Sequence, residues 1–215
     1  MPSLDCTLLA DGSSDTALLP ILEWVIRQHS GDAGVQCEWA DLRRLHEPPR
    51  ALVDRIVKAV EFYPCHLLFV HRDAEGQDPE MRYEEIHTAV QVARVRGVEL
   101  PYVCVVPVRM QEAWLLLEPS AIRHAVNNPH GTAPLNLPAP HRIEAHPNPK
   151  VLLYESLRTA SELSGRRLKR FQPEKGALLV SRHMSDFGVL RVLSAFRRLE
   201  GDVQANIAAL TARVR

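Results

Sequence analysis

Two carboxylates stand one residue apart directly after an apolar run, within residues 67–76 of the 215-residue chain. An apolar run between two helical patterns predicts a buried strand of a parallel sheet. Ligands of open α/β sheets bind beyond the carboxyl ends of the strands, where Asp73 and Glu75 fall. Side chains at i and i+2 of an extended segment point the same way, so these two carboxylates could share one cation. The alternative is a polar turn that ends the strand and binds nothing.

Two further carboxylates fall near the ends of other predicted strands. Asp11 closes the first strand, and Glu112 lies a few residues beyond the fourth. Because parallel strands bring their carboxyl ends to one edge of the sheet, these acids would repel one another unless a cation neutralised them. Oxygen ligands from Asp and Glu suit Mg²⁺ or Mn²⁺, which can polarise a phosphodiester and position a nucleophile. We therefore take Asp11, Asp73, Glu75 and Glu112 as candidate metal ligands and catalytic residues for phosphoryl transfer.

The elements that must position these acids alternate between strand and helix. The pattern predicts strands at 5–11, 35–42, 65–71 and 101–108, and helices at 16–29 (with Pro20 in its first turn), from Pro48 onward, and at 80–97. This alternation predicts right-handed βαβ units and a mainly parallel four-stranded sheet, with helices on both faces. We expect this Rossmann-like α/β domain to occupy residues 1–120. Residues 121–149 form a Pro-, Asn- and His-rich excursion without periodicity, and residues 150–215 a helical, basic extension packed on the same core. Four further helices are predicted at 151–163, 174–183, 187–200 and 203–214.

Charge divides along the chain, although the net charge is zero. Residues 1–120 hold 11 Lys and Arg against 19 Asp and Glu, whereas residues 121–215 hold 15 against 7. An acidic half followed by a basic half suits a metal site beside a polyanion-binding surface, although solvated helix faces could also segregate in this way. The chain shows no membrane-spanning apolar stretch, no secretory signal and four widely spaced cysteines, so we expect a cytoplasmic protein that does not bind a membrane.

Several residues are candidates for holding phosphate. Gly12 lets the chain turn past Asp11, and the following helix could offer free N–H groups to a phosphate. No Gly-Lys-Ser/Thr of a Walker loop follows, which argues against a nucleotide triphosphatase. If Asp73 points to the site, strand alternation directs His71 toward it and Arg72 away from it; alternatively, His71 is a packed strand-end histidine. Arg109 is either a phosphate clamp or an ion-pair partner of Glu112. The basic run near residues 166–170 is either a contact with a nucleic-acid backbone or a solvated helix corner. The phosphate and nucleic-acid candidates are Gly12, Ser13, His71, Arg109, Arg166, Arg167, Lys169 and Arg170, with Lys150, Arg158 and Lys175 adding positive charge.

Three segments resemble the motifs of Toprim domains. Residues 8–15 (Leu-Leu-Ala-Asp-Gly-Ser-Ser-Asp), followed by a helix, resemble the first motif, and residues 69–76 are similar to the second, the D-x-D at the end of a later strand. Residues 112–116 (Glu-Ala-Trp-Leu-Leu) resemble a segment of small stand-alone Toprim-like proteins, several of which are catalogued only as domains of unknown function. The resemblance covers residues 5–120. It implies a parallel α/β fold and Mg²⁺- or Mn²⁺-dependent cutting, joining or priming of nucleic acid.

The resemblance also implies partners. The overcoming-lysogenization-defect nucleases carry a Toprim domain and work with an ATPase in phage defence, so it implies an ATPase partner here. Toprim enzymes usually have Glu at the position of Asp11, as general acid or base, and Asp at the position of Glu75. Both differences keep the charge and the ligand type but move the oxygens, and catalytic geometry tolerates little displacement.

We therefore expect a divalent-metal-dependent nuclease, with DNA favoured over RNA and Asp11 as general base or metal ligand. Two rivals stay open: a catalytically degenerate Toprim-like module that senses or docks beside an ATPase, and a phosphotransfer domain with Asp73 as phospho-acceptor. The helices after residue 150 could form a homodimer face as easily as a nucleic-acid cradle.

Overall fold

The computed structural model describes residues 3–214 and contains one four-stranded sheet. Its strands are β1 (Ser3–Leu9), β2 (Gly34–Trp39), β3 (Leu67–His71) and β4 (Tyr102–Val105). They lie in the order β2-β1-β3-β4, and each neighbouring pair is parallel. The predicted fold class, an α/β fold with a parallel four-stranded sheet and a mostly helical C-terminal extension, is confirmed.

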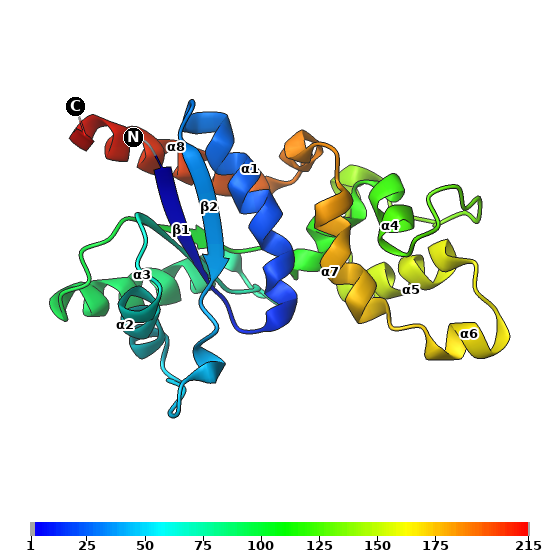
Figure 1. Ribbon diagram of the computed structural model, residues 1–215, viewed down its shortest axis with the longest axis horizontal. Helices are drawn as coiled ribbons and strands as arrows, with labels where there is room; N and C mark the ends of the chain where they lie inside the picture. Colours follow the sequence, from blue (N-terminus) through cyan, green and yellow to red (C-terminus); the bar gives the residue numbers. More distant parts are fainter. Residues whose placement is uncertain (1–2, 215) are drawn as a thin grey trace.

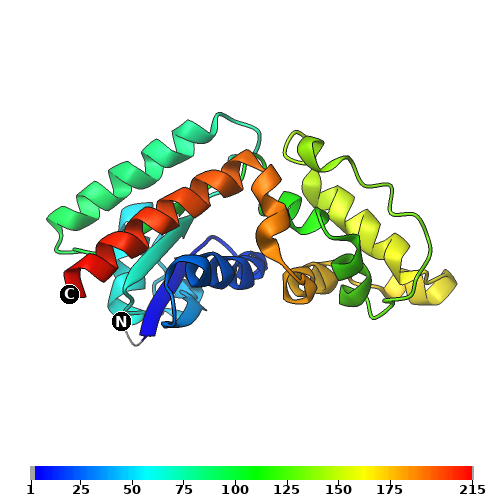
Figure 2. The ribbon, with the colours of Figure 1, turned by 90° about the horizontal axis from the view of Figure 1, so that it is seen from above.

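Helices cover both faces of the sheet. On one face, α1 (Leu19–His29) and α8 (Ser194–Val214) pack against side chains such as Leu8 and Phe69. On the other, α2 (Leu52–Phe62) and α3 (Pro79–Val95) pack against Leu9 and Val70. Consecutive strand residues thus pack against opposite faces, which is why every residue of β3 and the last four residues of β1 are buried. Figure 2 shows α3 and α8 running side by side past the edge formed by β4.

Several element boundaries differ from the prediction. The first strand ends at Leu9, two residues early, and a 3₁₀ turn, η1 (Ser13–Leu18), precedes α1. Pro20 lies in the first turn of α1, as predicted, because that turn needs no N–H from it. Two helices expected at 187–200 and 203–214 are instead a 3₁₀ turn, η5 (Phe187–Val192), and the continuous α8. Gly201 does not interrupt α8, because burial of neighbouring apolar side chains outweighs the roughly 1 kcal/mol cost of a helical glycine.

The remaining helices form a group beside the sheet domain (Figure 1). They are α4 (Pro119–Ala125), α5 (Pro149–Ser161), α6 (Gly165–Arg170) and α7 (Pro173–His183). Between α4 and α5 the chain is irregular apart from the 3₁₀ turn η4 (Pro140–Arg142), as the Pro-rich composition predicts. The chain then leaves this group, and α8 returns to cover the sheet and contacts α1 and β4. No helix within residues 3–214 is long and apolar enough to cross a membrane.

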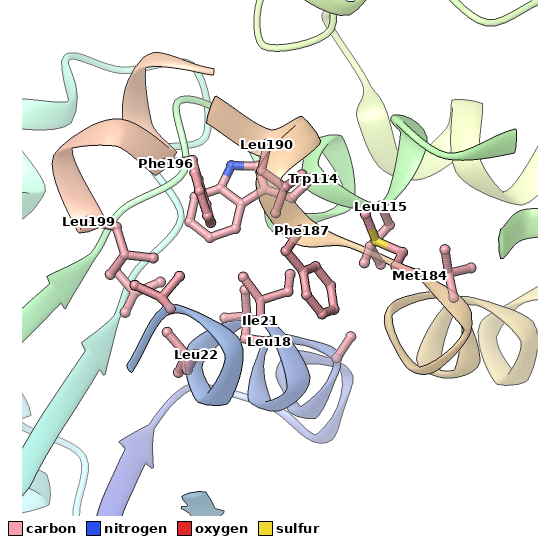
Figure 3. Packing of buried hydrophobic residues seen from close by; sticks show 14 of the residues in the cluster. Leu18, Ile21, Leu22, Trp114, Leu115, Met184, Phe187, Leu190, Phe196 and Leu199 are labelled. Atoms are coloured by element: carbon pink, nitrogen blue, oxygen red, sulfur yellow. The ribbon is translucent and has the colours of Figure 1, made fainter. Parts of the chain in front are cut away.

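A continuous apolar core joins the helical group to the sheet domain (Figure 3). Trp114 lies at its centre, fully buried, with its ring centroid 5.7 Å from that of Phe196 in α8. Trp114 belongs to the 3₁₀ turn η3 (Gln111–Leu116), which follows β4. This packing fixes η3 between the two parts of the molecule, and η3 also carries Glu112.

Candidate active site at the strand ends

A pocket of about 520 Å³ opens at the carboxyl ends of β1 and β3. Five residues predicted for the site line it, namely Asp11, Gly12, His71, Asp73 and Glu75. Their convergence follows from the parallel sheet, which brings the ends of β1 and β3 to the same edge. The strand-end location of the site was thus predictable, but the orientation of each carboxylate was not.

Asp73 is the centre of a group of three acids. The backbone N–H of Gln111 donates to Asp73 Oδ1 at 3.0 Å, and the Gln111 side-chain amide donates to Asp15 Oδ1 at 2.7 Å. Glu112 follows Gln111 in η3, and the residues Asp15 and Glu112 are 7% and 5% exposed. Gln111 therefore links Asp73 to Asp15. The turn that carries it also places Glu112 within electrostatic reach of Asp73, although Glu112 does not itself line the pocket.

The electrostatics show that these acids act on one another. Burial raises the pKa of Asp73 to about 6, and the negative charges of Glu112 and Asp15 contribute to the rise. His71 and the Gln111 N–H act in the opposite direction. Asp73 therefore gains and loses its proton close to neutral pH, and a cation beside it would favour the ionised form.

The Glu112→Gln substitution is expected to lower the pKa of Asp73, because it removes a neighbouring negative charge without removing bulk. The measurement is a carboxyl-carbon NMR titration of Asp73 without divalent ions. Asp54→Asn is the control, since Asp54 pairs with Arg96 elsewhere and should leave the titration unchanged. An Asp73 titration that does not move in Glu112→Gln would contradict the proposed coupling.

Lys150 is the contribution of the helical group to this pocket. It lies in the first turn of α5, and its Nζ is 3.4 Å from Glu112 Oε1. Burial is the largest single influence and acts to lower the pKa of Lys150. The charge of Glu112 and its hydrogen bond, together with the charges of Tyr154 and Asp73, outweigh burial, so the net shift is upward. The group of acids thus already contains one fixed positive charge, which sequence analysis assigned only to the basic surface.

Asp11 is held by two arginines from outside its own strand. Arg72 Nη1 donates to both carboxylate oxygens, at 2.8 and 3.1 Å, and Arg55 donates to Oδ1. Burial acts to raise the pKa of Asp11, but the hydrogen bond from Arg55 and the charge of Arg72 lower it overall. Asp11 lines the pocket with its charge already neutralised, whereas Asp15 lies beside Asp73.

Asp15 is the site residue that sequence analysis missed, because it entered only as the last residue of the motif at 8–15 and not as a candidate ligand. It caps the turn, since its Oδ2 accepts from the Gly12 N–H at 2.9 Å. The D-x-x-x-D spacing of Asp11 and Asp15 was the available signal. Two acids four residues apart can both face a site at the start of a helix.

The Glu75 side chain does not point the same way as that of Asp73, although we expected this for two acids in an extended segment. The strand ends at His71, and Glu75 adopts a left-handed backbone with φ of +54°. Its side chain is 65% exposed, and its nearest cation is Arg82, at 3.5 Å. Gly76 continues the turn at φ +83°, and a Cβ there would lie 2.6 Å from Arg109 Nη1. Glu75 therefore stands at the rim of the pocket, and Arg109 packs against the turn behind it.

His71 faces the site, as the strand alternation predicted. Its Nδ1 donates to the Val105 carbonyl at 2.9 Å, which leaves Nε2 3.6 Å from Asp73 Oδ1. The same alternation predicted that Arg72 points away, but its long side chain lines the pocket and reaches Asp11. The exposed basic residues of α6 lie at the far end of the helical group, away from the strand ends (Figure 1).

Within residues 3–214, no group of three or more His, Cys, Asp or Glu side chains is arranged so that it could hold a metal ion. A site for Mg²⁺ needs fewer protein ligands, because this ion is commonly bound through one or two carboxylates, waters and substrate phosphates. Asp73, with Asp15 and Glu112 beside it, fits that requirement.

Comparisons of this chain with protein-family models, with curated proteins and with solved structures gave no match. Function is therefore argued from the geometry of the pocket.

Proposed function

We propose that the protein is a divalent-metal-dependent nuclease or a related phosphodiester-processing protein. The observation that carries this proposal is the convergence of Asp15, Asp73 and Glu112 at the ends of parallel strands, with the pKa of Asp73 raised to about 6. Acids crowded in this way are typical of sites that bind a cation and perform acid–base chemistry. The resemblance of residues 5–120 to Toprim domains supports the same class of activity.

Each residue has a role that follows from its contacts. Asp73 and Asp15, linked by Gln111, would hold Mg²⁺ or Mn²⁺ together with water and the substrate phosphate, and Glu112 would act on Asp73 through its charge. A bound divalent ion would polarise the phosphodiester and stabilise the leaving oxygen. His71 Nε2, free because Nδ1 donates to a carbonyl, can exchange a proton at the pocket wall. Lys150 would attract the substrate phosphate, and Asp11 keeps two arginines at the rim.

The basic helical group offers a path for the nucleic acid. The described residues of α6 include Arg166, Arg167, Lys169 and Arg170, all exposed and none in an ion pair within residues 3–214. The 13-residue α5 spans about 20 Å between Lys150 and this segment. A bound duplex could therefore contact both the pocket and α6, and we propose DNA as the substrate.

Replacing these four α6 residues with alanine is expected to weaken DNA binding and its salt dependence. The slope of log Kobs against log [salt] is negative and should become less negative by about 0.9 for each removed cation that contacts a duplex phosphate. Fluorescence anisotropy at several salt concentrations measures this slope. The control is the double variant Arg27→Ala and Arg96→Ala, which removes two exposed arginines of the sheet domain. Equal slopes for the two variants would show that α6 has no special contact with DNA.

A second candidate function is a catalytically inactive Toprim-like subunit that docks beside an ATPase. The capture of Asp11 by Arg55 and Arg72 favours it, because an acid already paired with two cations is poorly available to a metal. Metal binding without turnover would identify this alternative.

A cleavage assay distinguishes the two. Plasmid, linear duplex, single-stranded DNA and RNA are each incubated with Mg²⁺, Mn²⁺ or EDTA, using wild type, Asp73→Ala and the control Asp54→Asn. We expect metal-dependent cutting in wild type and control, and none in Asp73→Ala. If nothing is cut but Mn²⁺ binds wild type and not Asp73→Ala, the docking alternative holds. If Mn²⁺ binds neither protein, the metal site proposed here is wrong.

A further inference from the structure

A second cavity lies along the outer edge of β4, away from the strand-end pocket. It falls between α3 and α8, which pass this edge side by side (Figure 2). It consists of two compartments of about 330 Å³ and 350 Å³, which share Arg94, Pro101 and Asn206. Each compartment is within the size range of small-ligand pockets.

The compartment of about 330 Å³, here called the inner compartment, is lined by backbone groups of β4 that make no hydrogen bond within the sheet. The carbonyls of Pro101 and Val105 accept hydrogen bonds from the β3 side. Because a strand directs its successive peptide groups to opposite sides, the N–H and C=O groups of Tyr102 and Cys104 point outward, toward α3 and α8. The free edge of β4 is therefore the floor of this compartment.

One of these two residues has no hydrogen-bond partner for its outward groups. The Tyr102 carbonyl accepts from Asn206 Nδ2 at 3.5 Å. By contrast, none of the hydrogen bonds among residues 3–214 beyond the β3–β4 ladder involves the N–H or C=O of Cys104, which is 3% exposed. A buried donor and a buried acceptor without partners are costly, so this edge favours a ligand that satisfies both.

The walls supply aromatic rings and a cation. The Tyr102 hydroxyl and His87 Nδ1 are hydrogen bonded at 2.6 Å, and Tyr83 lies beside His87 with ring centroids 6.4 Å apart. The Arg94 guanidinium stands 5.7 Å from the Tyr102 ring centroid and makes no ion pair within the described part of the chain. Glu99 and Asp202 are the acids of the two compartments.

Two other uses of this cavity are disfavoured. Arg198 of α8 pairs with Glu80 of α3 and so bridges the groove, which obstructs an added fifth strand. Burial raises the pKa of Cys104 to about 12, so its thiol stays protonated and is a poor nucleophile. A compact ligand fits the geometry better than an inserted strand or a covalent reaction.

We propose that this cavity binds a nucleoside monophosphate. The base would lie beside His87 and Tyr102, because the Arg198 guanidinium already covers the Tyr83 ring, 3.4 Å from its centroid. There its adjacent donor and acceptor atoms would pair with the Cys104 backbone. The phosphate would then reach Arg94, at the boundary of the two compartments. This ligand combines the three features that the cavity offers, namely a planar ring, a hydrogen-bonding edge and a negative charge. The proposal is independent of the strand-end chemistry.

The test is isothermal titration of AMP, GMP, CMP and UMP into the metal-free protein in EDTA. At least one nucleotide should saturate the wild type, and Arg94→Ala should weaken it at least tenfold. The matched control is Arg96→Ala, two residues along the chain, since Arg96 pairs with Asp54 and does not line the cavity. The corresponding nucleoside should bind more weakly than the nucleotide, and Arg94→Ala should not change its affinity further.

Three results would overturn the proposal: no saturation by any nucleotide at millimolar concentration, equal affinity in Arg94→Ala and wild type, or loss of binding in Arg72→Ala instead. The last result would place the nucleotide in the strand-end pocket. Because no cleavage is measured, failure here says nothing against the nuclease, and an inactive nuclease would not affect this result.

Discussion

The Asp73→Asn variant is expected to unfold at a higher temperature than wild type at pH 8, although it should lose all metal-dependent cleavage. The pKa of Asp73 is raised from 3.8 to about 6, so the folded state holds this proton more tightly than the unfolded state. Stability therefore falls as the pH rises from about 4 to 6, and above that range the ionised carboxylate costs about 3 kcal/mol. The asparagine removes this charge and can still accept the hydrogen bond from the Gln111 N–H.

Thermal unfolding in EDTA at pH 4 and pH 8 measures the effect. For a chain of this size, the gain at pH 8 corresponds to roughly 6–12 °C, and it should disappear at pH 4. Asp41→Asn is a control that should change the stability at pH 8 in the opposite direction. The hydrogen bond from Arg43 lowers the pKa of Asp41, so its neutralisation should destabilise the protein at pH 8. A stabilisation of Asp73→Asn that is equal at both pH values would contradict the charge explanation.

The Trp114→Ala variant is expected to lose about 3–5 kcal/mol of unfolding free energy. Trp114 is fully buried where η3, α8 and α1 meet, and its ring packs edge-on against Phe196 (Figure 3). Because η3 also carries Gln111 and Glu112, the cavity should loosen the site as well. The pKa of Asp73 should then move back toward its ordinary value.

Chemical denaturation measures the first effect, and an NMR titration of Asp73 the second. Trp114→Phe is the matched control. The Trp114 Nε1–H has no partner among the described residues, so phenylalanine removes volume but no hydrogen bond. It should cost clearly less than alanine. A loss below about 1 kcal/mol in Trp114→Ala would show that this packing does not hold the two parts together.

The sheet and the strand-end location of the site could be predicted because they follow from the alternation of strand and helix patterns, which is visible in the sequence. Asp73 and Glu112 were found in this way. The directions of Asp11 and Glu75 could not be predicted, since they depend on contacts and turns that spacing does not reveal. Arg55 is distant in sequence from the acid it binds, and Glu75 turns at a positive φ.

Lys150 illustrates a different limit of sequence reasoning. It reaches Glu112 only after the irregular segment that precedes α5, where no periodicity indicates how the chain returns. When a long irregular connection intervenes, the sequence does not indicate which residue beyond it will lie at the site.

The return of α8 to the sheet makes the α/β unit discontinuous in sequence. Its four strands are complete by Val105, but one covering helix is contributed from residue 194 onward, after the whole helical group. During synthesis, the part of the apolar face that α8 covers would stay exposed until residues 194–214 emerged from the ribosome. The helical group therefore occupies the position of an inserted domain, and the sheet domain depends on a helix that follows this group in sequence to complete its core.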